Sequence, residues 1–403
     1  NDVYLRSNLP FPNPDSVQEF NLQSSNFSAD YGNAAGGIVN IVTRSGTNEI
    51  HGTAFEFLRN GAVNARNFFA PRHDGLKRNQ FGGSAGGPIA KNKLFFFGTY
   101  QGTRVRDLPE GRQSFVPTAQ ERAGDFSSLS KRLTDPVTRQ PFPNNQIPAS
   151  RLNSVARYVL KWVPLPNGSG RQLTFPMKTV TERDDQFMTK IDLNRGGHQL
   201  SGRYFFSQYT QPALIPTENV LSANNRANHV RVQNIAGVHT FSVSPTLLLN
   251  STFGLSRQRG GSWATAPWGW PDAGSKIAAP SPPELSMSIT GGFSISTNHD
   301  GQFDRSSWTV REVVTKIAGP HELRFGGDVF RVYNHTVNVY QQAGSFTFSG
   351  QLSGDGMADF IVGRASGFNQ GGGEFKYLKG TQWAFFVQDD WRVGQRLTVN
   401  LGV

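Results

Sequence analysis

The chain has 403 residues, a formal net charge of +11 and no cysteine, so disulfides and thiolate metal sites are excluded. Hydrophobic residues make up 36% of it, and no apolar run reaches the about 18 residues that a transmembrane helix requires. This does not exclude a membrane protein, because strands that cross a bilayer need an apolar residue only at every second position.

Residues 1–48 differ in composition from the rest of the chain. They are polar and rich in asparagine and serine, and they end in the pair Gly36-Gly37, which is followed by a short expected strand over residues 38–43. Glycine allows two backbones to approach closely. We expect this segment to lie against the inner wall of a larger β-structure rather than to join that wall as another strand.

From residue 50 onward, apolar and polar residues alternate over long stretches. In the last stretch Leu397, Val399 and Leu401 fall on one face, and Thr398 and Asn400 fall on the other. Successive side chains of a strand point to opposite faces, so each stretch has one apolar and one polar surface. The pattern predicts about eleven strands, over residues 51–60, 79–89, 94–106, 184–193, 199–208, 229–243, 247–257, 307–318, 322–333, 377–391 and 396–403.

The connections between these strands alternate in length. Tight turns join antiparallel neighbours, and short turns at one end with long loops at the other are typical of a transmembrane barrel. We therefore predict an all-β fold, a transmembrane antiparallel β-barrel built as a meander. A soluble sandwich of two sheets would bury the same apolar faces and is the alternative. The long excursions cover residues 61–78, 107–183, 209–228, 258–306 and 334–376.

The alternation also predicts which side of the wall meets lipid. Leu249, Phe253 and Val399 are expected to point outward at bilayer depth. Thr252 and Thr398 are expected to line the lumen. An outward arginine at the midplane costs about 2–4 kcal/mol, whereas a lumen substitution is tolerated.

The residues that could carry chemistry do not form a catalytic pattern. Residues 82–86 match the Gly-x-Ser-x-Gly pattern of a nucleophile elbow, which needs a helix after the serine, but Pro88 and a turn follow. The eight histidines are scattered, and none has the His-x-x-x-His spacing of a helical metal site. We therefore predict that the protein is not an enzyme and has no catalytic residue, metal site or cofactor.

The positive charge is dispersed over strands and loops, without a basic stripe or a recognition helix. Nucleic acid is therefore not an expected partner. A basic lumen or rim would instead favour anionic solutes or contact the phosphates of lipopolysaccharide. Balancing acidic residues elsewhere in a longer chain are the alternative.

One excursion has the composition of a ligand-binding loop. It contains Trp263, Trp268 and Trp270 together with several prolines. Prolines stiffen a loop, and indoles provide stacking area at a low entropic cost. We expect this loop to bind a ligand such as a sugar or a peptide. Packing of the loop on itself, or anchoring at the membrane rim, is the alternative.

Ordered blocks of residues run through nearly the whole chain, over residues 17–20, 28–46, 51–60, 65–69, 78–83, 86–89, 94–98, 116–126, 145–153 and 386–393. In this order they resemble the TonB-dependent outer-membrane receptors, and more narrowly their Oar-like branch. The resemblance implies that residues 1–48 are the C-terminal part of a plug domain and residues 49–403 the N-terminal half of the barrel. Family barrels have on the order of 22 strands, so about half of one is expected before the chain stops at Val403.

The resemblance also implies a function. It predicts a receptor in the outer membrane of a Gram-negative-type bacterium, which takes up a substrate such as an oligosaccharide or a peptide. Energy would come from TonB and its inner-membrane motor complex, through a segment expected upstream of Asn1. The expected surroundings are outer-membrane lipid and lipopolysaccharide, around a monomeric barrel. The alternatives are an Oar-like surface adhesin or secretion-linked receptor without nutrient import, and a soluble β-rich binding protein.

The plug-like segment departs from the family in one place. Siderophore and vitamin transporters usually carry an Arg-Gly pair there, and this chain has the polar stretch 24–28 instead. The resemblance therefore does not indicate an iron–siderophore substrate, and the sequence does not identify the substrate.

Overall fold

The computed structural model describes residues 12–23, 28–31, 38–66, 68, 75–107, 112–175, 179–212, 219–222, 227–263, 266–279, 283–297 and 301–403. Eleven long strands in this part form one sheet, in which each strand is antiparallel to its neighbour in the order of the chain. The strands are β3 (His51–Asn60), β4 (Lys77–Ala90), β5 (Leu94–Asp107), β8 (Val180–Arg195), β9 (His198–Gln211), β10 (Ala227–Ser244), β11 (Leu247–Trp263), β14 (Gly301–Ala318), β15 (His321–Asn338), β18 (Glu374–Gly394) and β19 (Leu397–Gly402).

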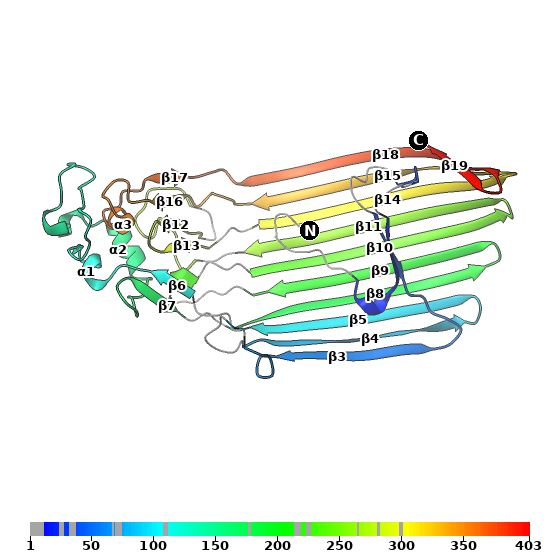
Figure 1. Cartoon of the computed structure of the whole chain (residues 1–403), viewed down its shortest axis with the longest axis horizontal. Coiled ribbons are helices and arrows are strands. Elements are labelled where there is room, and N and C mark those ends of the chain that lie inside the picture. The colour runs from blue at the N-terminus through cyan, green and yellow to red at the C-terminus, as the bar shows by residue number, and fades with distance from the viewer. Residues whose placement is uncertain are drawn as a thin grey trace.

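The predicted meander is confirmed, and we call this sheet the wall. Figure 1 shows its long strands side by side, with tight turns at one end and the long excursions at the other. The tight turns use the left-handed backbone conformation at Asn92, Gly196 and Gly319, with φ near +60°. Asparagine and glycine adopt it most readily.

The wall strands extend further toward the excursions than the alternation predicts. Strand β11 continues to Trp263, β14 begins at Gly301, and β15 runs to Asn338. These extensions contain glycine, arginine and other polar residues. In these extensions the backbone remains paired with the neighbouring strands, but apolar residues no longer alternate with polar ones. Periodicity alone therefore does not identify them as strand.

Four of the five long excursions fold together into one unit, which we call the cap (the described parts of residues 112–175, 219–222, 266–297 and 339–373). It contains a two-stranded antiparallel sheet of β6 and β7, a four-stranded sheet in the order β13-β12-β16-β17, and short helices. No helix in the described part of the chain is long and apolar enough to cross a membrane. The elements are β6 (Arg112–Phe115), α1 (Ala119–Arg122), η2 (Pro143–Asn145), η3 (Ala149–Arg151), α2 (Ser154–Leu160), β7 (Gln172–Phe175), η4 (Val220–Ser222), β12 (Ser286–Ile289), β13 (Ser294–Ser296), β16 (Ser345–Phe348), α3 (Gly356–Ile361) and β17 (Gly367–Asn369).

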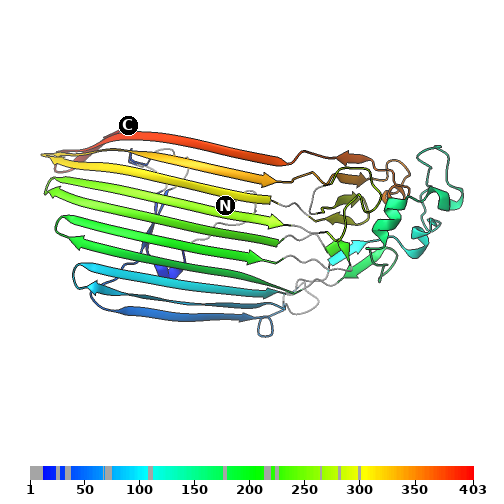
Figure 2. The same cartoon turned by 180° about the vertical axis from the view of Figure 1, so that it is seen from behind.

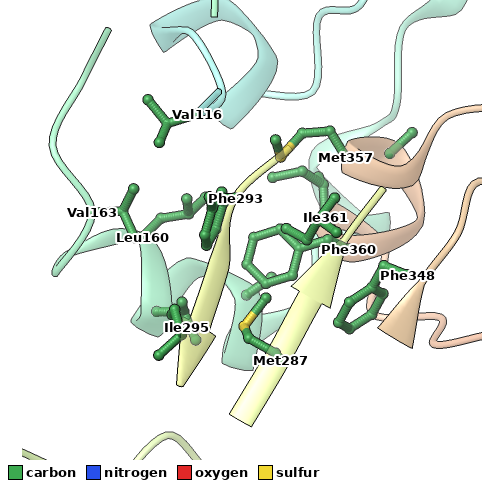
Figure 3. Packing of buried hydrophobic residues seen from close by; sticks show 14 of the residues in the cluster. Val116, Leu160, Val163, Met287, Phe293, Ile295, Phe348, Met357, Phe360 and Ile361 are labelled. Atoms are coloured by element: carbon green, nitrogen blue, oxygen red, sulfur yellow. The ribbon is translucent and has the colours of Figure 1, made fainter. Parts of the chain in front are cut away.

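All four excursions contribute to one hydrophobic core in the cap. Val159, Leu221, Trp270 and Phe360 come from different excursions and are buried in the same cluster. Figure 3 shows Phe360 beside Phe293, with the two ring centroids 5.6 Å apart. Because the core is shared, no single excursion buries its apolar side chains alone.

The N-terminal residues form a separate small unit. Helix η1 (Pro14–Ser16) leads into β1 (Val17–Gln23), which pairs with β2 (Ile38–Thr43) in a two-stranded sheet of its own. Strand β2 therefore pairs with β1 and not with β3. This unit lies across one face of the wall in Figure 1 and behind the wall in Figure 2. We call the described part of residues 12–46 the inner segment, and we call the wall face that it contacts the inner face.

Candidate functional site: the wall, the inner segment and the cap

The contacts of the inner segment define the two faces of the wall. Thr99, Arg311 and Gln388 bond to it, so they lie on the inner face. Alternation then places Phe253 and Val310, which are partners across β11 and β14, on the outer face. Thr252 pairs with Arg311 and faces inward as predicted.

The outer face is mainly apolar over about the first ten residues from the tight turns, the length that spans the hydrocarbon layer. Glu312 is an exception at this depth. Val399 points outward as expected, but its depth was predicted wrongly. It pairs with Trp391, which pairs with His321, the first residue of β15. Val399 therefore lies near the turns, at the membrane interface.

An ionic contact holds the inner segment to the wall near β14 and β15. Arg311 Nη2 donates to the backbone carbonyl of Asp30 at 2.9 Å and to its carboxylate at 3.4 Å. Arg324 lies 3.8 Å from the same carboxylate and donates to Ser28 Oγ at 3.0 Å. The Asp30 side chain is largely buried, so the two guanidinium groups replace the water that its charge would otherwise need.

Hydrogen bonds join the inner segment to other wall strands as well. Asn13 Nδ2 donates to Thr99 Oγ1 at 3.2 Å, and the Lys190 ammonium group donates to the Thr43 carbonyl at 3.3 Å and to Ser45 Oγ at 2.8 Å. These contacts are polar. A neutral hydrogen bond such as that of Asn13 contributes about 0.5–1.5 kcal/mol net, and one from a charged group such as Lys190 about 1.5–3 kcal/mol. Because these contacts are polar, water can replace them when the segment leaves the wall.

A buried ionic cluster joins two excursions of the cap. Arg171 Nε donates to Glu121 at 2.8 Å, and its two terminal nitrogens donate to both oxygens of Asp355 at 3.1 and 3.2 Å. Asp355 also caps helix α3 through the backbone N–H groups of Met357 and Ala358. Burial lowers the pKa of Arg171, but the two carboxylates outweigh it and raise the pKa above its ordinary value.

A second arginine ties helix α1 to the end of α2. Arg122 donates to the carbonyl oxygens of Leu160, Val163 and Pro164 at 2.7–3.0 Å. Burial lowers the pKa of Arg122. Cations are favoured at the C-terminal end of a helix, where carbonyl groups lack partners. Arg122 thus stabilises the cap and is not available to a ligand.

The cap has an open cleft of about 480 Å³ beside its small sheet. Hydroxyl groups line one part of it, and Ser286 Oγ lies 3.0 Å from Ser345 Oγ. Phe368 and Asn369 of β17 line another part, and Phe368 is exposed. Hydroxyl and amide groups next to an exposed ring can hydrogen-bond a polar ligand and stack on it.

The three tryptophans of the predicted ligand-binding loop are not brought together. Trp268 and Trp270 are each 2% exposed and contact each other edge to face in the cap core. Their rings cannot stack on a ligand in this conformation, which agrees with the alternative of loop packing. Trp263 ends β11, is 40% exposed, and lies 5.1 Å from the ring of His229.

The sequence analysis missed the cap cleft. The short alternation Ser-Met-Ser-Ile over β12 and Ser-Phe-Thr-Phe over β16 could have indicated it, because both put hydroxyls on one face and apolar groups on the other. Within the described residues, no group of three or more His, Asp or Glu side chains could hold a metal ion.

A wall of antiparallel strands with short turns at one end, an apolar outer face and a polar segment against its inner face defines the class of outer-membrane β-barrels. The family model described as "Outer membrane beta barrel domain" matches residues 42–403. The chain therefore belongs to that family and is a protein of the outer membrane. Membership of this family and the arrangement of the strands in one meander exclude the alternative of a soluble sandwich of two sheets.

Individual relatives agree with the family. Over 90 residues the chain is 37% identical to the TonB-dependent transporter Oar of Myxococcus xanthus, an alignment that covers 20% of this chain and 8% of that protein. The resemblance to TonB-dependent receptors and their Oar-like branch is thereby confirmed. These relatives are transporters or receptors and not enzymes, in agreement with the sequence-based expectation.

Two crystal structures of variants of the ferric enterobactin receptor of Pseudomonas aeruginosa share the fold. Each has a TM-score of 0.50, with 12% and 11% identity, over 96% of this chain and 44% of the receptor. The chain thus spans less than half the length of these structures, and only a small part of the Oar transporter.

Proposed function

We propose that this chain is part of a TonB-dependent receptor that takes up a substrate across the outer membrane. In this proposal residues 1–48 are the C-terminal part of the plug, and residues 49–403 are the N-terminal half of the barrel. The observation that carries it is the inner segment, which lies on the inner face through Asp30, Arg311 and Arg324. A segment held in this way blocks a lumen and can still be displaced.

The mechanism follows from the polarity of these contacts. TonB, through a segment outside this chain, would pull on the plug with energy from the inner membrane. The contacts of Asp30, Asn13 and Thr43 with the wall would then break one at a time. The neutral hydrogen bond of Asn13 would cost about 0.5–1.5 kcal/mol, and each hydrogen bond that involves a charged group about 1.5–3 kcal/mol. Water would replace them, and a passage along the inner face would open.

Substrate capture would take place on the cap. The cleft beside β12, β16 and β17 offers hydroxyl groups and an exposed aromatic ring, which suits an oligosaccharide or a peptide. Trp268 and Trp270, which are buried in the cap core, would contribute by holding the cap in shape. We further propose that the assembled receptor is a monomer surrounded by outer-membrane lipid and lipopolysaccharide.

A reversible cross-link tests whether the inner segment has to move. A Cβ atom on Gly402 would lie 2.7 Å from the Ala29 Cβ, so Ala29→Cys/Gly402→Cys can form a disulfide after a shift of about 1 Å and a rotation of the Gln388 side chain. In the full-length receptor, oxidation should abolish uptake and a reductant should restore it. The control is Thr53→Cys/Ser84→Cys, which joins two paired wall strands whose hydroxyls are 2.8 Å apart.

Uptake that persists in the oxidised Ala29→Cys/Gly402→Cys receptor, with the cross-link verified on a non-reducing gel, would contradict the proposal. If the cross-linked receptor instead retained cell-surface adhesion or secretion, the Oar-like adhesin or secretion-linked receptor would be the better description. The wall cross-link should leave uptake unchanged in either state.

A further inference from the structure

Basic residues gather at one height on the outer face of the wall. Arg104, Arg257 and Arg331 each stand ten residues beyond the first residue of β5, β11 and β15, counted from the tight turns. A tilted strand crosses the hydrocarbon layer in about 9–11 residues. These arginines therefore lie at the extracellular border of the apolar band. Further from the tight turns, toward the cap, the same face carries Arg183, Arg231, Arg259 and Lys379.

A hollow of about 530 Å³ opens on the outer face over β10, β11, β14 and β15, the strands that carry Arg231, Arg257 and Arg331. Trp263, His229, Arg259 and Gln302 line it. It exists because Gly261 has no side chain, and a Cβ atom there would lie 2.7 Å from the His229 ring. An exposed indole, an imidazole and a guanidinium group around one hollow can hold a sugar ring with an anionic substituent.

The positive charge beside the hollow is only partly balanced. Asp304 pairs with Arg259 at 3.2 Å. Arg231 donates to the neutral amide of Gln208 at 2.6 Å, and Arg257 has no ion-pair partner among the residues that the structure describes. Arg231 and Arg257 can therefore take an anion without losing a carboxylate partner.

We propose that this outer-face site binds the headgroup of a phosphorylated glycolipid from the outer leaflet. Arg231 and Arg257 bind a phosphate, Trp263 stacks on a sugar ring, and the acyl chains lie along Leu255 and Phe253. Leu255 precedes Arg257 by two residues on the same face and is exposed, so one ligand can reach both. This continuity favours a lipid over a free phosphate. The proposal rests on the location in the outer membrane and not on substrate uptake.

Binding of purified diphosphoryl lipid A to the full-length receptor in detergent, measured by native mass spectrometry, tests the site. Arg231→Gln/Arg257→Gln should weaken binding about tenfold, because charge-assisted hydrogen bonds are lost. The control Arg195→Gln/Lys316→Gln removes the same charge from the outer face near the tight turns and should bind like the wild type. Heat-modifiable migration verifies that both variants are folded.

Lipid A without its phosphates separates the two parts of the site. The wild type should bind it about tenfold more weakly than diphosphoryl lipid A, and Trp263→Ala should weaken binding of both forms. Equal binding of the two forms, or an equal loss in the control variant, would overturn the proposal. Phosphatidylglycerol binding as tight as lipid A would overturn the choice of a glycolipid. Substrate uptake by the same variants is a separate measurement from lipid A binding. If the lipid-binding proposal is overturned, the transport proposal is therefore unaffected.

Discussion

Arg171 shows how one residue connects parts of the chain that are far apart in sequence. It lies immediately before β7 and bridges Glu121 of α1 to Asp355, the N-cap residue of α3. Glu121 is only 3% exposed. A buried carboxylate without its cation is costly, because neither water nor a counter-charge solvates it. Nothing in the local sequence indicates this pairing, since it depends on the meeting of two excursions.

Replacement of Arg171 by methionine should destabilise the cap by about 3–5 kcal/mol, the usual cost of breaking a buried ion pair on one side. Hydrogen exchange in the full-length receptor should speed up over α1 and α3, while amides of β10 and β11 keep their protection. The control Arg132→Met removes an exposed arginine of the same cap, and its effect should stay within about 0.5 kcal/mol. Similar exchange in both variants would show that the ionic cluster does not hold the excursions together.

At the scale of single elements, the sequence predicted the wall well. Alternation in residues such as Leu323, Phe325 and Val329 is imposed by lipid on one side and water on the other, so it marks each strand inside the bilayer. Beyond the bilayer both faces are wet. The ends of β11 and β15 therefore carry residues such as Arg259 and Asn334, and periodicity no longer identifies them as strand.

The short strands of the cap were missed for a different reason. Strands β12 and β16 have only four residues each, too few for a periodic signal to stand out. They pair in parallel across a separation of more than 50 residues, and a long-range pairing of this kind leaves no local trace. The tryptophan-rich loop gave a clear signal, but aromatic rings in a loop serve stacking and core packing equally well.

The two faces of β10 and β11 allow a matched test of which face meets lipid. Phe253 faces outward and Val238 inward, and each lies six residues from the tight turn between Ser244 and Leu247. Both side chains are apolar and half-exposed, at 45% and 37%. Phe253→Arg should cost about 2–4 kcal/mol near the midplane and reduce the heat-resistant barrel in outer-membrane fractions. Val238→Arg should assemble normally. Equal yields would mean that the outer face does not contact hydrocarbon.

At the scale of the molecule, the antiparallel meander creates the cap. Because every second connection returns to the same end of the wall, four excursions that are distant in sequence emerge beside one another. Together they bury a common core. This explains why the sequence predicted the wall and its loops but not the cap. The wall is specified by local alternation, whereas the cap is specified by which loop ends the wall brings together.

If the cap folds as one unit, damage in one excursion should loosen another. Trp270 packs edge to face against Phe346, with ring centroids 5.1 Å apart, and belongs to the same core as Val159 of α2. Trp270→Ala should cost about 3–5 kcal/mol through the cavity that it leaves. Trypsin should then cleave the full-length receptor in α2, at Arg157, far from the substitution in sequence.

Trp263→Ala is the matched control. It also removes an indole, but from the end of β11 that is nearer the cap, and Trp263 is not part of the cap core. It should leave α2 as resistant to trypsin as in the wild type, and the wall strands should resist cleavage in both variants. Cleavage of Trp270→Ala confined to residues 266–297 would mean that the excursions fold independently. In that case the cap cleft would be a gap between separate loops. Cleavage at α2 would instead indicate that the cleft is a preformed site whose shape depends on all four excursions.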